Sequence, residues 1–138
     1  MTDFFNPVVA QLYPDPETFD LIVLSGGTAG PMDSDPWVLK LQDFLHTTID
    51  CYPQQKIVRV CWGHQTICVA FRGIVGSMDA AEIGVKRMKL TEEGCKMFPR
   101  NAVLHLHQFH RREITVPAQG FVPLAEEHEA FLNHTNTI

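Results

Sequence analysis

The sequence predicts an α/β fold in which helices flank a parallel or mixed sheet. Two short apolar runs, ending at Leu24 and Val60, are each followed by a segment with apolar residues at helical spacing. Strands and helices that alternate along a chain favour a parallel sheet, because each helix returns the chain to the edge where the next strand begins. With 138 residues, the chain is expected to form one domain, residues 1–138.

The first strand is expected in "FDLIVL", residues 19–24, because Ile, Val and Leu crowd there as in a strand covered on both faces. Ser25, Gly26 and Gly27 end it, and a loop rich in Gly, Pro and Asp follows. A helix is expected to begin at Pro36, with Asp35 as its N-cap. Its apolar face consists of Trp37, Leu41, Phe44 and Leu45.

A second strand, a tight turn and a second helix are expected in "QQKIVRVCWGHQTICVAFRGIVG", residues 54–76. Beyond Gly76 the apolar segments are shorter and alternate with polar residues, so we expect strands and loops at the edge of the sheet. The last segment, residues 130–138, is expected to open another strand.

Composition and charge exclude several classes of partner. The net charge is −5, and the 11 Lys and Arg residues are scattered, so neither nucleic acid nor an anionic membrane is expected. No apolar run approaches the length of a membrane span, and the first ten residues lack the features of a signal peptide. We therefore expect a cytoplasmic protein whose partner is a small molecule or another protein.

Cysteines and histidines are candidates for metal ligands, but their spacing does not favour a metal site. The four cysteines are Cys51, Cys61, Cys68 and Cys95. They lack CxxC spacing, so we expect reduced thiols. His105 and His107 would share one face of a strand near His110, yet the segment offers no recognisable zinc ligand set. A metal site is therefore the minority alternative to polar, partly buried histidines. "SGGTAG" also lacks the Lys of a phosphate-binding loop, so ATP use is not expected, and we expect no cofactor.

Cys61 ends the second apolar strand and directly precedes the second helix. A nucleophile at such a turn projects outward, and the helix amino terminus offers N–H donors that favour a thiolate. The alternative is that Cys61 packs as a small buried apolar residue, as most buried cysteines do. The strand, the turn and Gly63 together favour the nucleophile, whereas packing is the preferred role of the other three cysteines.

The segment "VCWGHQ", residues 60–65, resembles the nucleophile segment of class I glutamine amidotransferases, in which a G-x-C-x-G-H-Q pattern carries the catalytic cysteine. The resemblance extends to "FDLIVLSGG" and to "LHLHQFHRREITVPAQGFVPLAEE" and so covers most of the chain. The chain is most similar to the stand-alone GMP-synthase-like amidotransferases. This resemblance implies an incomplete flavodoxin-like class I glutamine amidotransferase fold.

The resemblance also implies roles for particular residues. Cys61 would attack the side-chain amide of glutamine and form a γ-glutamyl thioester that water hydrolyses. The backbone N–H groups of Gly27 and Trp62 would form the oxyanion hole. The residues implied to bind the substrate are Gly26, Gln65 and His110.

Three departures from the family pattern stand out. Arg59 occupies the position of the usual glycine two residues before the nucleophile, which predicts a distorted turn. Residues 1–18 do not supply the family's first strand convincingly, and the family's C-terminal His/Glu segment would follow the last residue, Ile138. The histidines that could serve in its place, none at a matching position, are His64, His110 and His134.

Three functions therefore stay open. The chain is expected to be an enzyme acting on glutamine or a related amide. It could instead be a catalytically impaired relative that binds a ligand or a protein, or a scaffold recruited to other small-molecule biosynthetic chemistry. An uncovered strand edge predicts a homodimer or larger assembly. Fused relatives carry a synthetase domain, so the resemblance also implies a synthetase as the other expected partner.

Overall fold

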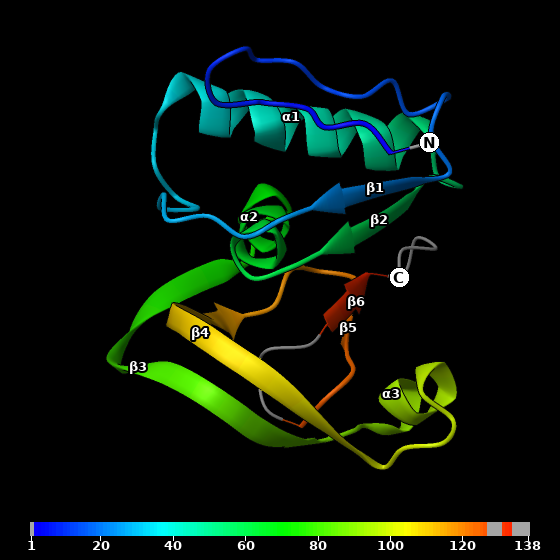
Figure 1. Cartoon of the computed structure of the whole chain (residues 1–138), viewed down its shortest axis with the longest axis vertical. Helices are drawn as coiled ribbons and strands as arrows, with labels where there is room; N and C mark the ends of the chain where they lie inside the picture. The colour runs from blue at the N-terminus through cyan, green and yellow to red at the C-terminus, as the bar shows by residue number, and fades with distance from the viewer. Residues whose placement is uncertain (1, 127–130, 134–138) are drawn as a thin grey trace.

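The computed structural model describes residues 2–126 and 131–133. Strand β1 (Leu21–Leu24) lies parallel to β2 (Lys56–Arg59), with Ile22 opposite Ile57. Helix α1 (Pro36–Cys51) connects them (Figure 1). The predicted helix start is confirmed, because Asp35 is the N-cap and Pro36 lies in the first turn.

The parallel pair is covered on one face. Ile22 and Ile57 are buried in the main hydrophobic core, which also contains Val38, Leu41 and Leu45 of α1. On the opposite face, the exposed fractions of Leu21 and Val23 are 46% and 59%. The expectation that this strand is covered on both faces is therefore wrong within the described residues. Successive side chains of a strand alternate in direction, and only those on the face of Ile22 and Ile57 pack into the core with α1.

Helix α2 (Trp62–Ala70) connects the two parts of the molecule. It contacts α1 and β2 on one side and strands β3 (Ile74–Lys89) and β4 (Val103–Val116) on the other (Figure 1). Eight of its nine residues are buried, and Ile67 and Cys68 are completely enclosed in the core. This burial fixes the first turn of the helix, which carries the candidate functional residues.

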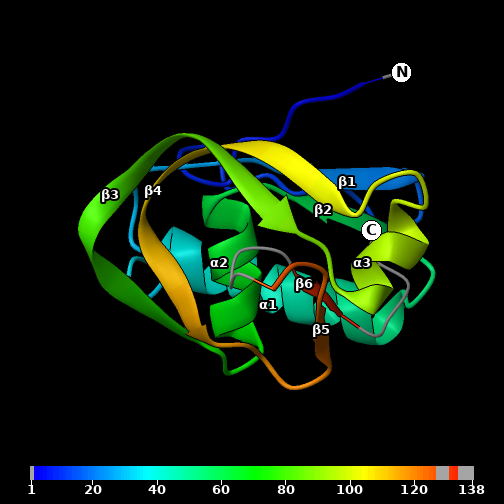
Figure 2. The same cartoon turned by 90° about the horizontal axis from the view of Figure 1, so that it is seen from below.

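Strands β3 and β4 form a long antiparallel hairpin that curves past α2 (Figure 2). This corrects the expectation of short strands at the edge of the parallel sheet, because the two strands form a two-stranded sheet of their own. A bulge breaks the pairing: Ser77 lies opposite Arg112, and Glu82 lies opposite His110. Four residues of β3 thus face one residue of β4, and an insertion of this kind bends a strand and shifts its alternation.

Helix α3 (Glu92–Met97) joins the two long strands and was not expected from the sequence. The Thr91 Oγ1 caps it by accepting a hydrogen bond from the Gly94 N–H at 3.1 Å. Strands β5 (Phe121–Pro123) and β6 (Phe131–Asn133) then pair antiparallel. The strand expected in residues 130–138 is confirmed for β6, while His134 and the rest of that segment lie outside the described residues.

Candidate active site

Cys61 occupies a strained turn between β2 and α2. It is the N-cap of α2, with φ 53° and ψ −114°. Few residues other than glycine adopt a positive φ, and such a conformation costs about 1–3 kcal/mol. Backbone hydrogen bonds to the Cys61 carbonyl oxygen from His64 (2.9 Å) and Gln65 (3.1 Å) hold the turn. The turn leaves Cys61 exposed, while Cys68 of the same helix is buried.

Gly63 lets the first turn of α2 lie against the end of β1. A Cβ atom at this position would lie 2.5 Å from the carbonyl oxygen of Leu24 and 2.8 Å from its Cγ. That same carbonyl accepts a hydrogen bond from the Val60 N–H at 2.9 Å, so it cannot move away freely. The close approach brings Cys61 next to the loop that follows β1.

That loop contains Gly26 and Gly27, and both lie beside the turn. A Cβ atom on Gly26 would lie 3.5 Å from the Cys61 Cβ and 3.9 Å from its Sγ. A Cβ atom on Gly27 would lie 3.6 Å from the indole ring of Trp62. Trp62 is the first residue of α2, where a backbone N–H has no acceptor within the helix. The structure thus places these four predicted site residues together.

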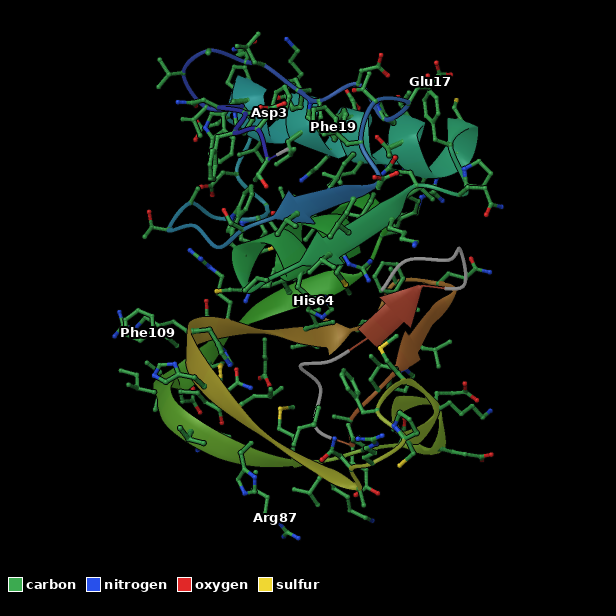
Figure 3. All side chains as sticks on the ribbon, turned by 45° about the vertical axis from the view of Figure 1, so that its right-hand side comes forward. Asp3, Glu17, Phe19, His64, Arg87 and Phe109 are labelled. Atoms are coloured by element: carbon green, nitrogen blue, oxygen red, sulfur yellow. The ribbon has the colours of Figure 1, made fainter. Side chains whose placement is uncertain are left out.

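Strand β4 forms the third side of the site. The Cys61 Sγ lies 4.0 Å from the carbonyl oxygen of Phe109, whose side chain points outward from the hairpin (Figure 3). The Gln65 Nε2 donates to the carbonyl oxygen of Arg112 at 3.0 Å, and the His110 Nδ1 lies 3.0 Å from the same oxygen. Gln65 and His110, both predicted to bind substrate, are therefore held by one backbone atom.

His110 has further polar neighbours on the hairpin. Its Nε2 lies 3.0 Å from the Gln108 Oε1 and 3.5 Å from the Glu82 Oε2. The bulge in β3 brings Glu82 opposite His110. Sequence reasoning missed Glu82, Gln108 and Arg112, because the pairing register across a bulge cannot be read from the alternation of either strand.

A partly buried cation lies beneath the turn. Arg59 stacks over the Phe121 ring, with 5.7 Å from its Cζ to the ring centroid. Burial lowers the pKa of Arg59 to about 10. Burial, followed by the charge of Arg59, lowers the pKa of His64 to about 4. His64 lies inside, between the parallel pair and the hairpin (Figure 3), and is neutral near pH 7.

The Arg59 side chain does not prevent the strained turn. Cys61 keeps its positive φ while the guanidinium group packs against Phe121. The Arg59 side chain extends toward Phe121 of β5, and the contacts that a Cβ atom on Gly63 would make are with Leu24. The distortion expected from the loss of the usual glycine stays a prediction.

The cysteines are expected to differ in reactivity toward iodoacetamide. Burial raises the pKa of Cys68, which lowers the fraction of reactive thiolate. We expect native protein to be alkylated at the exposed Cys61 and Cys51, and Cys68 to react only after unfolding. Peptide mass spectrometry over time measures this order. Alkylation of Cys68 as fast as that of Cys51 would contradict it.

Other features of the described residues lie away from Cys61. An open hollow of about 500 Å³ lies at the β3 bulge beside Glu82, and one of about 480 Å³ lies near Cys51. Residues 2–126 and 131–133 contain no group of three or more potential ligands placed to hold a metal ion. Within the same residues, no helix is long and apolar enough to cross a membrane.

The class-I glutamine amidotransferase family model matches residues 6–136. The chain belongs to this family. It is 41% identical over 140 residues to the glutamine amidotransferase-like protein chyE of Penicillium rubens, a match that covers 99% of this chain and 59% of chyE. It is also 36% identical over 132 residues to chry6 of Gibberella zeae, covering 94% of this chain and 55% of chry6. The chain thus spans somewhat more than half the length of these relatives.

Solved structures show the same fold. A glutamine amidotransferase from Thermotoga maritima has a TM-score of 0.77 at 17% identity, over 91% of this chain and 56% of that one. A GMP synthase subunit from Thermoplasma acidophilum has a TM-score of 0.71 at 19% identity, over 89% of this chain and 63% of that one. The predicted family and the predicted α/β, flavodoxin-like fold class are both confirmed.

Proposed function

We propose that this amidotransferase-family chain hydrolyses the side-chain amide of glutamine, with Cys61 as the nucleophile. The observation that carries the proposal is the position of Cys61, exposed on a strained turn between the first N–H of α2 and the loop of Gly26 and Gly27. In such an arrangement the sulfur atom and the backbone donors would face the same space.

The reaction proceeds in two steps. The Cys61 sulfur bonds to the amide carbon, and the N–H groups of Gly27 and Trp62 stabilise the negative charge that develops on the oxygen. The carbon–nitrogen bond breaks, and the nitrogen leaves as ammonia with the proton that the thiol gave up. Water then attacks the γ-glutamyl thioester, releasing glutamate and restoring the thiol.

The substrate would lie between the turn and β4. Gly26 leaves space beside the Cys61 sulfur because it has no side chain. A Cβ atom at this position would lie 3.9 Å from the Sγ. Gln65 and His110 line the side formed by β4, where their shared partner, the Arg112 carbonyl, holds them in place. We assign these three residues to glutamine binding.

A second candidate function is a ligand-binding relative with little turnover. The observation that favours it is that the recorded polar neighbour of the Cys61 sulfur, within the described residues, is the carbonyl of Phe109 and not an imidazole. A carbonyl oxygen cannot take the thiol proton, so it cannot activate the nucleophile. Binding of glutamine without ammonia release would identify this function.

Expected partners beyond the substrate stay predictions. The solved relative from Thermoplasma acidophilum is described as a GMP synthase subunit. A synthetase partner of this chain would use the ammonia that glutamine hydrolysis releases. A second copy of the chain is the other predicted partner. The cytoplasmic location also stays a prediction.

The test is covalent labelling with a diazoketone analogue of glutamine, followed by mass analysis of each cysteine. We expect labelling of Cys61 to saturate with analogue concentration and to be blocked by L-glutamine, because the analogue must first occupy the pocket. Cys51, which is exposed away from the site, is the internal control and should react slowly and without saturation.

The Cys61→Ser variant completes the test. We expect it to lose both saturable labelling and ammonia release from glutamine, while Cys51→Ser keeps both. Equal rates of ammonia release from the native protein and Cys61→Ser would refute hydrolysis by Cys61. Labelling of Cys61 that neither saturates nor responds to glutamine would refute a glutamine pocket.

A further inference from the structure

Arg112 contacts three segments of the candidate site through its guanidinium group and its backbone carbonyl oxygen. Its guanidinium Nη1 donates to the carbonyl oxygen of Ala29 at 3.2 Å, in the loop after β1. Its own carbonyl oxygen accepts from the Gln65 Nε2 and lies 3.0 Å from the His110 Nδ1. One residue of β4 therefore connects the loop of Gly26 and Gly27 (the diglycine loop), the first turn of α2 and the hairpin.

The carbonyl end of Arg112 has two side-chain neighbours. A backbone oxygen has two lone pairs; the Gln65 Nε2 donates to this oxygen, and the His110 Nδ1 lies 3.0 Å from it. The oxygen is turned toward α2 at the point where the β3 bulge shifts the pairing with β4. Because Gln65 is one helical turn after Cys61, this contact fixes the nucleophile turn relative to β4.

The guanidinium end of Arg112 holds a loop that has few other restraints. Of residues 25–29, the described part of the chain records a hydrogen bond only at the Ala29 carbonyl, to Arg112. The next restrained turn, Gly30–Asp33, is closed by its own local hydrogen bonds. Loops with adjacent glycines lose much conformational freedom on ordering, so a single hydrogen bond is important for their position.

The position of this loop matters for the proposed chemistry. The Gly27 N–H must lie within hydrogen-bond distance of the oxyanion when the bond to the Cys61 sulfur forms. A displacement of about 1 Å in a catalytic arrangement can reduce the rate about 100-fold. The residue that sets the distance between the loop and the nucleophile turn therefore controls the rate without touching the substrate.

We propose that Arg112 is a positioning residue that holds the Gly26–Gly27 loop in register with Cys61. The inference rests on the proposed function. Arginine suits this positioning role because its planar guanidinium group reaches across from β4 and donates in a fixed direction. A lysine amine is a flexible point donor.

The test compares Arg112→Met and Arg112→Lys with Arg111→Met. Arg111 is adjacent and exposed, so its replacement removes the same charge without removing a contact with the loop. Two rates are measured at Cys61: saturable labelling by the diazoketone analogue of glutamine, and alkylation by iodoacetamide, which needs no oxyanion hole.

We expect Arg112→Met to lower the maximal rate of labelling by the glutamine analogue about 10- to 100-fold, with little change in the concentration that gives half the maximal rate. Iodoacetamide alkylation should change far less, because Cys61 is already exposed and this reaction needs no oxyanion hole. Arg112→Lys should restore part of the rate, and Arg111→Met should match the native protein. A merely structural role would change both reagents together.

The result also separates this inference from the proposed function. If native protein is labelled with saturation and Arg112→Met retains the native maximal rate, the positioning role is wrong and the function stands. If native protein shows no saturable labelling, the function is wrong, and hydrogen exchange of residues 25–30 decides the role of Arg112. Faster exchange in Arg112→Met and Arg112→Lys than in Arg111→Met supports it, and equal exchange refutes it.

Discussion

Replacing Gly63 by alanine is expected to reduce the free energy of unfolding by roughly 3 kcal/mol, near the upper end of typical overpacking costs. The new methyl group would lie 2.5 Å from the Leu24 carbonyl oxygen, which is backbone and cannot rotate away. Either α2 moves away from β1, or β1 loses its hydrogen bond to Val60. Urea unfolding followed by circular dichroism measures the loss.

The matched control is Gly27→Ala in the neighbouring loop. Its methyl group would meet the Trp62 ring at 3.6 Å, an ordinary van der Waals distance, so we expect a change within about 0.5 kcal/mol. Equal midpoints for the Gly63 and Gly27 variants would show that the close approach of α2 to β1 does not limit this position.

Acidification is expected to destabilise the protein through His64. The folded protein holds the His64 pKa at about 4, while an unfolded chain has about 6.5. Between these values the unfolded state binds more protons, so the free energy of unfolding falls as pH decreases from about 6.5 to 4. The His64 contribution to this fall is at most about 3 kcal/mol, since each pKa unit corresponds to about 1.4 kcal/mol.

Urea unfolding at several pH values in native protein, His64→Gln and His105→Gln measures this contribution. We expect His64→Gln to lose less stability between pH 6.5 and 4 than the native protein. His105→Gln, which replaces an exposed histidine, should follow the native curve. If all three proteins lose the same stability, burial of His64 does not govern the acid response.

The first half of the chain was predictable because local signals agree there. Apolar runs ending at Leu24 and Val60, Pro36 at a helix start, and Cys61 before a helical pattern all indicate the same strand–helix order. The family was also predictable, because the spacing of Cys61, Gly63 and Gln65 reflects the geometry of one turn. This spacing can be recognised in the sequence without knowing the rest of the fold.

The second half was less predictable for physical reasons. The bulge after Ser77 interrupts the alternation that marks a strand, so the length of the β3–β4 hairpin was hidden. The contact between Gln65 and the carbonyl of Arg112 involves a backbone atom, and no side-chain pattern records where a carbonyl points. The role of Arg112 therefore emerged only from the folded structure.

The two tryptophans of the chain, Trp37 and Trp62, lie with ring centroids 5.4 Å apart, and the Trp62 ring lies beside Gly27 of the loop after β1. Indole emission depends strongly on the polarity and contacts around the ring. Because Gly27 of the loop lies against the Trp62 ring, we expect the intrinsic fluorescence of the protein to report loop movement. We expect the same emission to follow occupancy of the site without an added dye, including occupancy by a ligand that does not react.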